Sequence, residues 1–373
     1  MGARSVVGVG LVLMMLFTAQ GARAQFRRPV IGAYNLSDLG VVDDISQSRL
    51  NSNPSWAGSC QQPSGSVEIC GFYNQGIPPW NLRYGAPATD HSFVNSQGRG
   101  INGAGFAVGQ ATTGTLVFGV EFIGPEWVRF LKPLNAFASS TTNDINDNGI
   151  SVGESWGNSN GLPGLATQWQ SGVAHDLTAG WDGGARIGSS AATAINMRDT
   201  TAGWFHDPNR AFNRTAWIML TDGVLHDDVA ESFQDSQVTD INDSDVVVGL
   251  GTTLAGDSRG FIGCVGCSES QLAPLPGDFV TEAHGLNNSS LVVGFSTGAD
   301  GQRAVTWNVA TSAAPAPVDL NTQLGLLTTG FRLIKAVAVN DAGQILCAGR
   351  ITGGLGVQPD PSTTIRAILL TPR

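Results

Sequence analysis

The stretch Asp144-Ile145-Asn146-Asp147-Asn148-Gly149-Ile150-Ser151-Val152-Gly153 contains the signature that decides the fold. An apolar residue precedes an asparagine, a turn rich in Asn, Asp and Gly follows, and a β-branched segment leads to a glycine seven residues after that first asparagine. Asn, Asp and Gly accept the positive φ angles of tight hairpin turns, and β-branched residues favour strands. The stretch therefore predicts a β-hairpin.

The same signature recurs along the chain. Its anchoring residues are Asn51, Asn102, Asn146, Asn196, Asn242, Asn287 and Asn340, at successive spacings of 51, 44, 50, 46, 45 and 53 residues. In the seventh copy the glycine is shifted to Gly349. A second hairpin often follows the first, and its opening strand carries an aromatic residue, as at Trp169, Trp217, Phe261 and Trp307. Four short strands in each period of about 45–50 residues are typical of a propeller blade.

The two ends of the chain complement each other. Leu36-Ser37-Asp38-Leu39-Gly40 has the pattern of a last strand, whereas the seventh repeat stops at its third strand, Arg366 to Pro372. Pairing these two strands would remove two exposed sheet edges. We therefore expect an all-β, seven-bladed propeller of four-stranded blades, closed by pairing the N-terminal strand with the C-terminal blade. The alternative is an open β-solenoid, which favours shorter and more even repeats with capping ends.

The composition agrees with a folded, glycine-rich β protein. Glycine accounts for 49 of the 373 residues, 42% of residues are hydrophobic and only 13% are charged, with a net charge of −10. Disordered chains have few apolar groups, and collagen needs glycine at every third position. A net negative charge repels a phosphate backbone, so we expect no nucleic-acid partner.

The first residues have the pattern of a secretory signal peptide. Arg4 gives the positive end, residues 6–19 are apolar, and Ala22-Arg23-Ala24 forms a cleavage site of the A-x-A type. We expect cleavage after Ala24, leaving residues 25–373 as one monomeric propeller domain in the periplasm or outside the cell, with no membrane span. The alternative is an N-terminal anchor, but the apolar run is short for a span of about 20 residues.

All five cysteines follow this segment. Cys60 and Cys70 are candidates for a disulfide that closes a short loop. Cys264 and Cys267 form either a local disulfide or two free thiols, because the second pair of ligands that zinc needs is absent from the sequence. Cys347 lies in an apolar strand pattern, which predicts a buried thiol.

The C-terminal region has a characteristic pattern, which consists of Asp319-Leu320-Asn321, residues 336–345 and residues 366–372. This pattern resembles the HAF-repeat family of bacterial extracellular repeat proteins, and the repeats extend the resemblance over nearly all of the mature chain. The His-Ala-Phe tripeptide that names the family is absent: Arg259-Gly260-Phe261, Arg303-Ala304-Val305 and Arg366-Ala367-Ile368 stand in its place. The resemblance implies a secreted repeat protein and supplies no catalytic residues.

Two clusters of residues lie outside the repeat pattern. The insertion after Cys70 contains the ligand-binding candidates Tyr73, Trp80, Arg83 and Tyr84, followed by His91. Aromatic faces beside charged groups suit sugar rings, and loops on a rigid scaffold often bind ligands. The alternative is an ordered insertion that buries these aromatics.

The second cluster follows the fourth anchor. It contains Trp204 as a ligand-binding candidate, with His206 and Arg210 beside it. A histidine can transfer protons near neutral pH, and an arginine can stabilise an anion. His206, His91 and Arg210 are thus weak catalytic candidates, and an ordinary surface loop is the alternative.

A calcium site is the one cofactor that the sequence suggests. Asp144, Asn146 and Asn148 match the start of a calcium-binding loop, but position twelve of the loop is Ser155 and Glu154 comes one residue early. The repeat turn explains the same residues without a metal.

These observations favour a secreted, non-enzymatic binding or interaction module, with a polysaccharide or a surface protein as its partner. A Walker loop and an H-E-x-x-H motif are absent from the sequence. The alternative is a polysaccharide-active enzyme with a propeller fold, either a lyase or a glycoside hydrolase.

Overall fold

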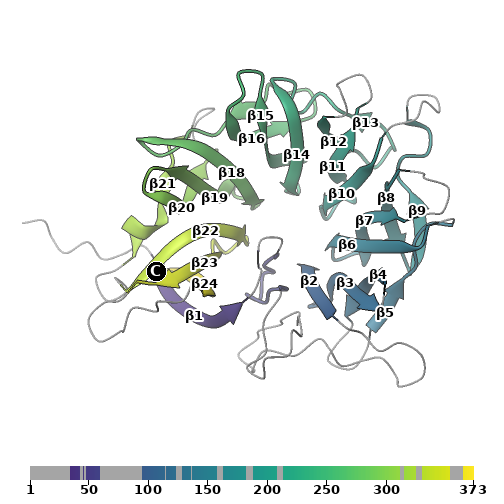
Figure 1. Ribbon diagram of the computed structural model, residues 1–373, viewed down its shortest axis with the longest axis horizontal. Helices are drawn as coiled ribbons and strands as arrows, with labels where there is room; N and C mark the ends of the chain where they lie inside the picture. The colour runs from purple at the N-terminus through teal and green to yellow at the C-terminus, as the bar shows by residue number, and fades with distance from the viewer. Residues whose placement is uncertain are drawn as a thin grey trace, which may run out of the picture. The chain divides into compact units, whose positions relative to one another are not determined.

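The chain folds into six four-stranded sheets that surround a common centre (Figure 1). In this computed structural model the described residues are 34–42, 45, 48–58, 95–113, 115–122, 128–135, 137–157, 163–181, 188–207, 213–310, 315–324, 330–352 and 364–373. They all belong to one compact unit, Ile31–Arg373. The predicted all-β propeller with four-stranded antiparallel blades is confirmed.

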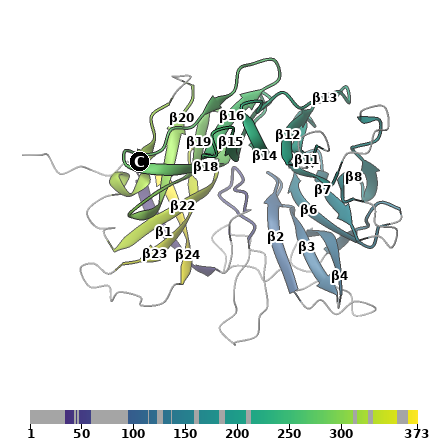
Figure 2. The same cartoon turned by 45° about the horizontal axis from the view of Figure 1, so that its top comes forward.

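The first five sheets follow the chain from the centre outward, as Figure 2 shows for β2, β3 and β4. The first three sheets consist of β2 (Asn95–Ile101), β3 (Ala107–Thr113), β4 (Leu116–Phe122) and β5 (Val128–Leu131); of β6 (Ser139–Ile145), β7 (Ile150–Trp156), β8 (Leu165–Gln170) and β9 (Val173–Asp176); and of β10 (Ser190–Ile195), β11 (Thr201–His206), β12 (Arg214–Met219) and β13 (Leu225–His226).

The last three sheets consist of β14 (Phe233–Ile241), β15 (Val246–Thr253), β16 (Ser258–Cys264) and β17 (Ser270–Gln271); of β18 (Asp278–Leu286), β19 (Leu291–Gly298), β20 (Gly301–Asn308) and β21 (Val318–Asp319), which a short 3₁₀ helix, η3 (Leu320–Gln323), follows; and of β22 (Phe331–Val339), β23 (Ile345–Ile351), β24 (Ile365–Pro372) and β1 (Tyr34–Val42). In every sheet the innermost strand ends at the residue before an anchoring asparagine, as the repeat predicts.

The N-terminal strand completes the last sheet. Tyr34 pairs with Pro372 and Val42 with Ile365, so β1 lies antiparallel to β24. The side chain of Arg366 strengthens this pairing, because its Nε lies 2.9 and 3.0 Å from the two carboxylate oxygens of Asp38. These are the two strands whose pairing the ends of the chain predict.

The prediction of seven blades is wrong for the described residues, which form six. In the first repeat the described segment 48–58 makes only an isolated bridge between Leu50 and Trp56 instead of a four-stranded sheet. Residues 59–94 lie outside the described residues. The segment packs on both of its neighbours, because Leu50 and Trp56 join the core of the last sheet and Ala57 joins the core of the first.

The hydrophobic core lies between consecutive sheets. The aromatic residues that the repeat places in the third strand are fully buried: Trp169, Trp217, Phe261 and Trp307 are at most 1% exposed. Trp217, for example, packs with Val152 of the preceding sheet. Each sheet thus covers both of its faces with its neighbours, which explains why the strands are rich in apolar residues on both sides.

The seven anchoring asparagines connect the repeats in a cycle of hydrogen bonds. Each Nδ2 donates to the main-chain oxygen of the next anchor, from Asn51 through Asn102, Asn146, Asn196, Asn242, Asn287 and Asn340 back to Asn51, over 2.9–3.4 Å. The side-chain oxygen closes the turn of its own repeat: Oδ1 of Asn196 accepts the N–H groups of Arg198 and Thr200 at 2.9 and 3.0 Å. One side chain therefore fixes the turn and links neighbouring repeats.

The conserved spacing to glycine also has a steric cause within this chain. A Cβ on Gly153 would lie 2.0 Å from the main-chain oxygen of Thr141 on the innermost strand. The equivalent distances for Gly109, Gly203, Gly249 and Gly294 are 1.8–2.2 Å. In these five sheets the second strand passes so close to the first at this point that only a residue without a side chain fits. The last sheet differs, because Cys347 occupies the equivalent position opposite Ala336.

Candidate ligand site in the central cavity

Every innermost strand contains a β-bulge three residues before its anchor. In the first sheet the pairing steps from Gly98 to Gly100 and leaves Arg99 out of register. A bulge of this kind redirects the side chain of the unpaired residue. The bulged residues are Arg99, Asn143, Thr193, Thr239, His284 and Val337, and Ser48 holds the same position before Asn51.

These seven residues line a single cavity of about 550 Å³, which we call the central cavity. Side chains from further along the inner two strands extend its wall, namely Glu154, Trp204, Gln237, Leu250, Glu282 and Lys335. The volume lies within the range of small-molecule sites. The bulges thus bring residues that are far apart in sequence to one place on the propeller axis.

Arg49 forms the floor of the central cavity. It lines this cavity and also a smaller hollow of about 240 Å³ on the side of the asparagine turns, so its side chain separates the two. Its Nη2 donates to the main-chain oxygens of Thr193 and Thr239 at 3.2 and 2.6 Å. Its Nη1 lies 3.2 Å from Asp240 Oδ1, and its Nε lies 3.7 Å from Asp144 Oδ1.

The two aspartates beside Arg49 are held by the main chain. Oδ2 of Asp144 accepts the N–H of Ile195 at 3.1 Å, and Oδ2 of Asp240 accepts the N–H of Leu286 at 2.8 Å. Burial raises the pKa of Asp144 to about 6, and neither Arg49 nor the N–H donors fully offset this effect. Burial also raises the pKa of Asp240. The floor is therefore a compact ionic cluster that joins several blades.

The wall of the central cavity contains a cationic side chain, Arg99, and an acidic one, Glu154. Arg99 donates from Nη1 to Asn143 Oδ1 at 2.6 Å and from Nη2 to Gln110 Oε1 at 3.2 Å. Burial raises the pKa of Glu154, and the positive charge of Arg99 acts in the opposite direction. This part of the wall offers both donors and acceptors to a ligand.

His284 occupies the opposite side of the ring of bulges. Its ring stacks on Phe295 with 5.7 Å between centroids, and its Nε2 lies 3.2 Å from Glu282 Oε2. Burial lowers the pKa of His284 to about 4; Lys335 and Arg49 act in the same direction and Glu282 acts against them. His284 is therefore neutral at neutral pH.

His284 makes stability depend on pH in a direction that can be measured. Its folded pKa of about 4 lies below the ordinary 6.5, so the unfolded chain binds the proton first as the pH falls. Neutral His284 makes its full contribution to the free energy of unfolding above pH 6.5. This contribution decreases by about 3 kcal/mol as the pH approaches 4. Denaturant unfolding at pH 7 and pH 4.5 should show that His284→Gln loses less stability on acidification than the wild-type chain.

The wild type must be compared with His284→Gln because Asp144 changes the free energy of unfolding in the opposite direction. Its folded pKa of about 6 lies above the ordinary 3.8, so protonation of Asp144 favours the folded state as the pH falls through this range. This contribution is common to the wild type and His284→Gln, and it cancels in their difference. The prediction would be contradicted if the difference in the free energy of unfolding between the wild type and His284→Gln were the same at both pH values. His226→Gln, on the outer strand β13, controls for the loss of an imidazole outside the cavity.

Trp204 is the one predicted binding residue that the structure places in this site. It is half-buried on β11 and lines the central cavity. His206 follows on the same face of the strand, with its ring centroid 5.1 Å from that of Trp204, but it is not among the lining residues. Arg210 lies outside the described residues. The structure thus brings Trp204 and His206 together and places only Trp204 against the cavity.

The other candidates from the insertion stay predictions. Tyr73, Trp80, Arg83, Tyr84 and His91 lie outside the described residues. The same holds for Cys60 and Cys70 and therefore for their predicted disulfide.

The calcium candidates take part in contacts between repeats. Nδ2 of Asn146 donates to Asp199 Oδ1 at 2.7 Å, and Nδ2 of Asn148 donates to the same oxygen at 2.8 Å. Asp144 faces Arg49 instead. In the part of the chain that the structure describes, no group of three or more His, Cys, Asp or Glu side chains is placed to hold a metal. The calcium prediction stays untested.

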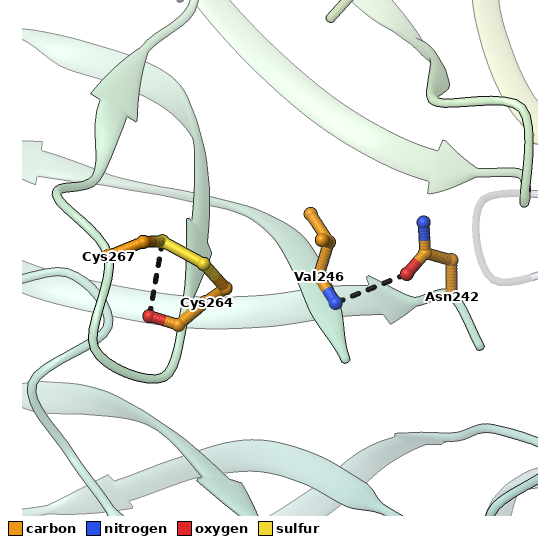
Figure 3. Close-up of a disulfide and its surroundings, with 4 residues drawn as sticks. All are labelled: Asn242, Val246, Cys264 and Cys267. Carbon is orange, nitrogen blue, oxygen red and sulfur yellow. Dashed lines mark hydrogen bonds between the residues drawn. A yellow bond between two sulfur atoms is a disulfide. The ribbon is translucent and has the colours of Figure 1, made fainter. Parts of the chain in front are cut away.

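The remaining cysteines have distinct states. Cys264, at the end of β16, and Cys267, in the turn after it, form a disulfide (Figure 3). This selects one of the two alternatives that the sequence left open. Cys347 is a free, buried thiol on β23, as expected, and burial raises its pKa.

Most residues of the central cavity were not predicted from the sequence, namely Arg49, Arg99, Glu154, Glu282, His284 and Lys335. A signal existed, because the position three residues before the anchor changes from Ser to Arg, Asn, Thr, Thr, His and Val, while the residue directly before the anchor stays apolar. A variable position at a constant place in a repeat indicates a surface that the fold itself does not require.

The chain has only distant similarity to known proteins. No family model matches the chain, and no curated protein matches it. Solved structures that resemble it include a TolB-type protein from Agrobacterium tumefaciens, with 12% identity over 62% of this chain and 81% of that chain and a TM-score of 0.42. A gluconolactonase from Xanthomonas campestris is 11% identical over 92% of both chains, with a TM-score of 0.39.

A third similar structure is a mutant of AofleA from Arthrobotrys oligospora, at 9% identity over 72% of this chain and 81% of that chain, with a TM-score of 0.37. Similarity at this level assigns no activity to the present chain. Among the described segments, no helix is long and apolar enough to cross a membrane.

Proposed function

We propose that this protein is a non-enzymatic binding module and that its ligand is a glycan held in the central cavity. The observation that supports this most strongly is the ring of bulges, which directs a different side chain from each repeat into one cavity of about 550 Å³. A scaffold that only had to fold could repeat one residue at this position. The variation supports selection of a ligand.

The chemistry of the wall suits a sugar. Trp204 offers an apolar ring face to the C–H groups of a sugar ring. Gln237, Glu282 and Arg99 offer acceptors and donors that can pair with hydroxyl groups. Sites of this kind combine an aromatic surface with a few placed polar groups.

An enzyme that cleaves polysaccharides is the second candidate, and one observation favours it. Glu154 and Glu282 line the same cavity as His284, and burial raises the pKa of Glu154. A carboxylic acid with a raised pKa can serve as a general acid, and a second carboxylate can complete the pair that glycoside hydrolysis uses. Release of products from a panel of polysaccharides, followed by chromatography, would favour this candidate over the binding module.

Trp204→Ala tests the proposed site directly. Loss of a stacked aromatic should weaken glycan binding at least tenfold, because a stacking contact contributes about 1 kcal/mol or more beyond its buried area. Isothermal titration with a glycan identified on a glycan array would measure the change. Phe279→Ala is the matched control, because Phe279 is 59% exposed on β18 and is not among the residues that line the central cavity. Equal affinities for the wild type and Trp204→Ala would show that the ligand binds elsewhere, for example at the proposed surface around Trp80 and Tyr84.

We also propose that the protein works outside the cytoplasm. The pattern of residues 1–24 and the disulfide between Cys264 and Cys267 support this, because structural disulfides persist in oxidising compartments. N-terminal mass spectrometry of the protein from its natural host should find a first residue of Gln25. A chain that retains residues 1–24 would contradict export by cleavage.

A further inference from the structure

We infer that the central cavity recognises the neutral terminal unit of a glycan and not an internal segment. This inference rests on the proposed function and defines its ligand more closely. It is based on three features of the cavity, namely its closed floor, an unsatisfied hydroxyl at that floor, and the balance of its charges.

The floor stops a chain from passing along the propeller axis. The side chain of Arg49 reaches acceptors on β10, β14 and β18, and its own N–H donates to the main-chain oxygen of Arg99 on β2 at 3.0 Å. It also pairs with Asp144 on β6. Contacts in so many directions fix the guanidinium across the channel. Beneath it lies the cycle of asparagine hydrogen bonds. A ligand that enters the cavity must therefore end there.

Ser48 places at the floor a hydroxyl group without a hydrogen-bond partner in the described part of the chain. Its side chain lines the central cavity beside Arg49, and the residue is only 2% exposed. Its Oγ has no hydrogen-bond partner among the described residues. Buried hydroxyl groups without partners are uncommon in folded proteins. A ligand hydroxyl that reaches the floor would supply this missing partner.

The neighbouring hydroxyls are oriented to accept a further hydrogen bond. Thr193 Oγ1 donates to Val238 O at 2.8 Å, and Thr239 Oγ1 donates to Ala283 O at 2.9 Å. Each threonine has used its single proton, and its oxygen can still accept. The lower wall thus complements a ligand rich in hydroxyl groups.

The charges around the cavity are already matched within the protein. Arg49 faces Asp144 and Asp240, and Arg99 acts on Glu154. His284 is neutral at neutral pH, with Glu282 beside it and Lys335 nearby. The ionised side chains of the cavity are thus already paired with one another. A charged terminal sugar would lose its hydration there without gaining an unpaired side chain of opposite charge. A neutral sugar avoids this penalty.

A glycan array tests the inference with the full-length protein. The array carries neutral and acidic oligosaccharides attached through their reducing ends, so their other ends are free. For each neutral glycan bound, two soluble competitors are compared: the methyl glycoside of its terminal sugar, and the same oligosaccharide with that sugar blocked as a 4,6-O-acetal. We expect the methyl glycoside to compete within about tenfold of the unblocked oligosaccharide, and the blocked chain to lose at least tenfold.

Ser48→Ala tests the contact at the floor. The substitution removes a hydroxyl that has no protein partner, so the folded state should keep its stability. We expect the affinity for the neutral glycan to fall about five- to tenfold, as for the loss of one hydrogen bond. Ser289→Ala, on the exposed turn between β18 and β19, is the matched control and should bind as the wild type does.

The outcomes separate the two levels of the proposal. If blocked chains compete as well as unblocked ones, or if acidic termini are preferred, the inference is overturned and the binding module stands. If Ser48→Ala binds with unchanged affinity, the terminal unit does not reach the floor, and the inference is likewise overturned. If the array shows no binding to any glycan, the proposed function itself fails.

Discussion

Gly153→Ala will destabilise the protein by more than about 3 kcal/mol, because overpacking against fixed backbone is among the costliest of core changes. The new Cβ would lie 2.0 Å from the main-chain oxygen of Thr141 and 2.9 Å from the Cα of Thr142. Neither atom belongs to a side chain that can rotate away, so the bulged strand β6 must move. The midpoint of chemical denaturation, measured by tryptophan fluorescence, should fall sharply.

Gly164→Ala, directly before β8 of the same sheet, provides the matched control. A Cβ on Gly164 would meet nothing closer than 3.5 Å, which is an ordinary contact, and a compatible Gly→Ala change is neutral or slightly stabilising. If the two variants unfolded at the same denaturant concentration, the steric account of the repeated glycine would be wrong.

Asn196→Ala should cost about 4 kcal/mol, from four hydrogen bonds that each contribute about 1 kcal/mol. The Nδ2 of Asn196 donates to Asn242 O at 2.9 Å and to Asp245 Oδ1 at 2.7 Å. Its Oδ1 accepts the N–H groups of Arg198 and Thr200. The residue is only 4% exposed, and its hydrogen bonds to Asn242 O and Thr200 N–H are buried, so these two partners would be left without water to replace the amide. Calorimetric melting should show the loss as a lower Tm.

Two further variants identify the source of this loss. Asn196→Asp keeps the acceptor that closes the turn and removes the donor to the next repeat, so an intermediate loss is expected. Asn308→Ala, at an exposed end of β20, removes a solvent-exposed hydrogen bond from the N–H of Ala310 and should cost no more than about 1 kcal/mol. Equal losses for Asn196→Ala and Asn308→Ala would mean that the asparagine cycle does not stabilise the fold.

The structure accounts for the repeat signature atom by atom. Asn146 needs both a donor and an acceptor at one position, and only an amide side chain of this length supplies them to its own turn and to Asn196. Gly153 needs the absence of a side chain. These two requirements recur in five of the six sheets, which is why the spacing of seven residues persists there while the blades differ elsewhere. In the last sheet Cys347 holds the position of the glycine.

The candidate site was not predictable in the same way. Trp204 was predicted as a binding residue because it is an aromatic residue close to His206 in the sequence, and Trp204 does line the cavity. Arg99 and His284 are 185 residues apart in the sequence and become neighbours of one cavity only when the strands surround a common axis. Nothing in the local pattern of either residue shows that it sits on a bulge, because the register of a strand depends on the partner strand.

The sequence by itself determined the all-β class, the hairpins, the four-stranded blades and the partner of the N-terminal strand, since all of these depend on local turn chemistry and on periodicity. Only the tertiary structure decided how many sheets the described residues form, that segment 48–58 enters the ring as a turn, and that Arg49 crosses its centre. The physical reason is the range of the interactions. Turns and strands are set by neighbours along the chain, whereas the guanidinium of Arg49 finds acceptors up to 235 residues away, and such partners exist only after the ring has assembled.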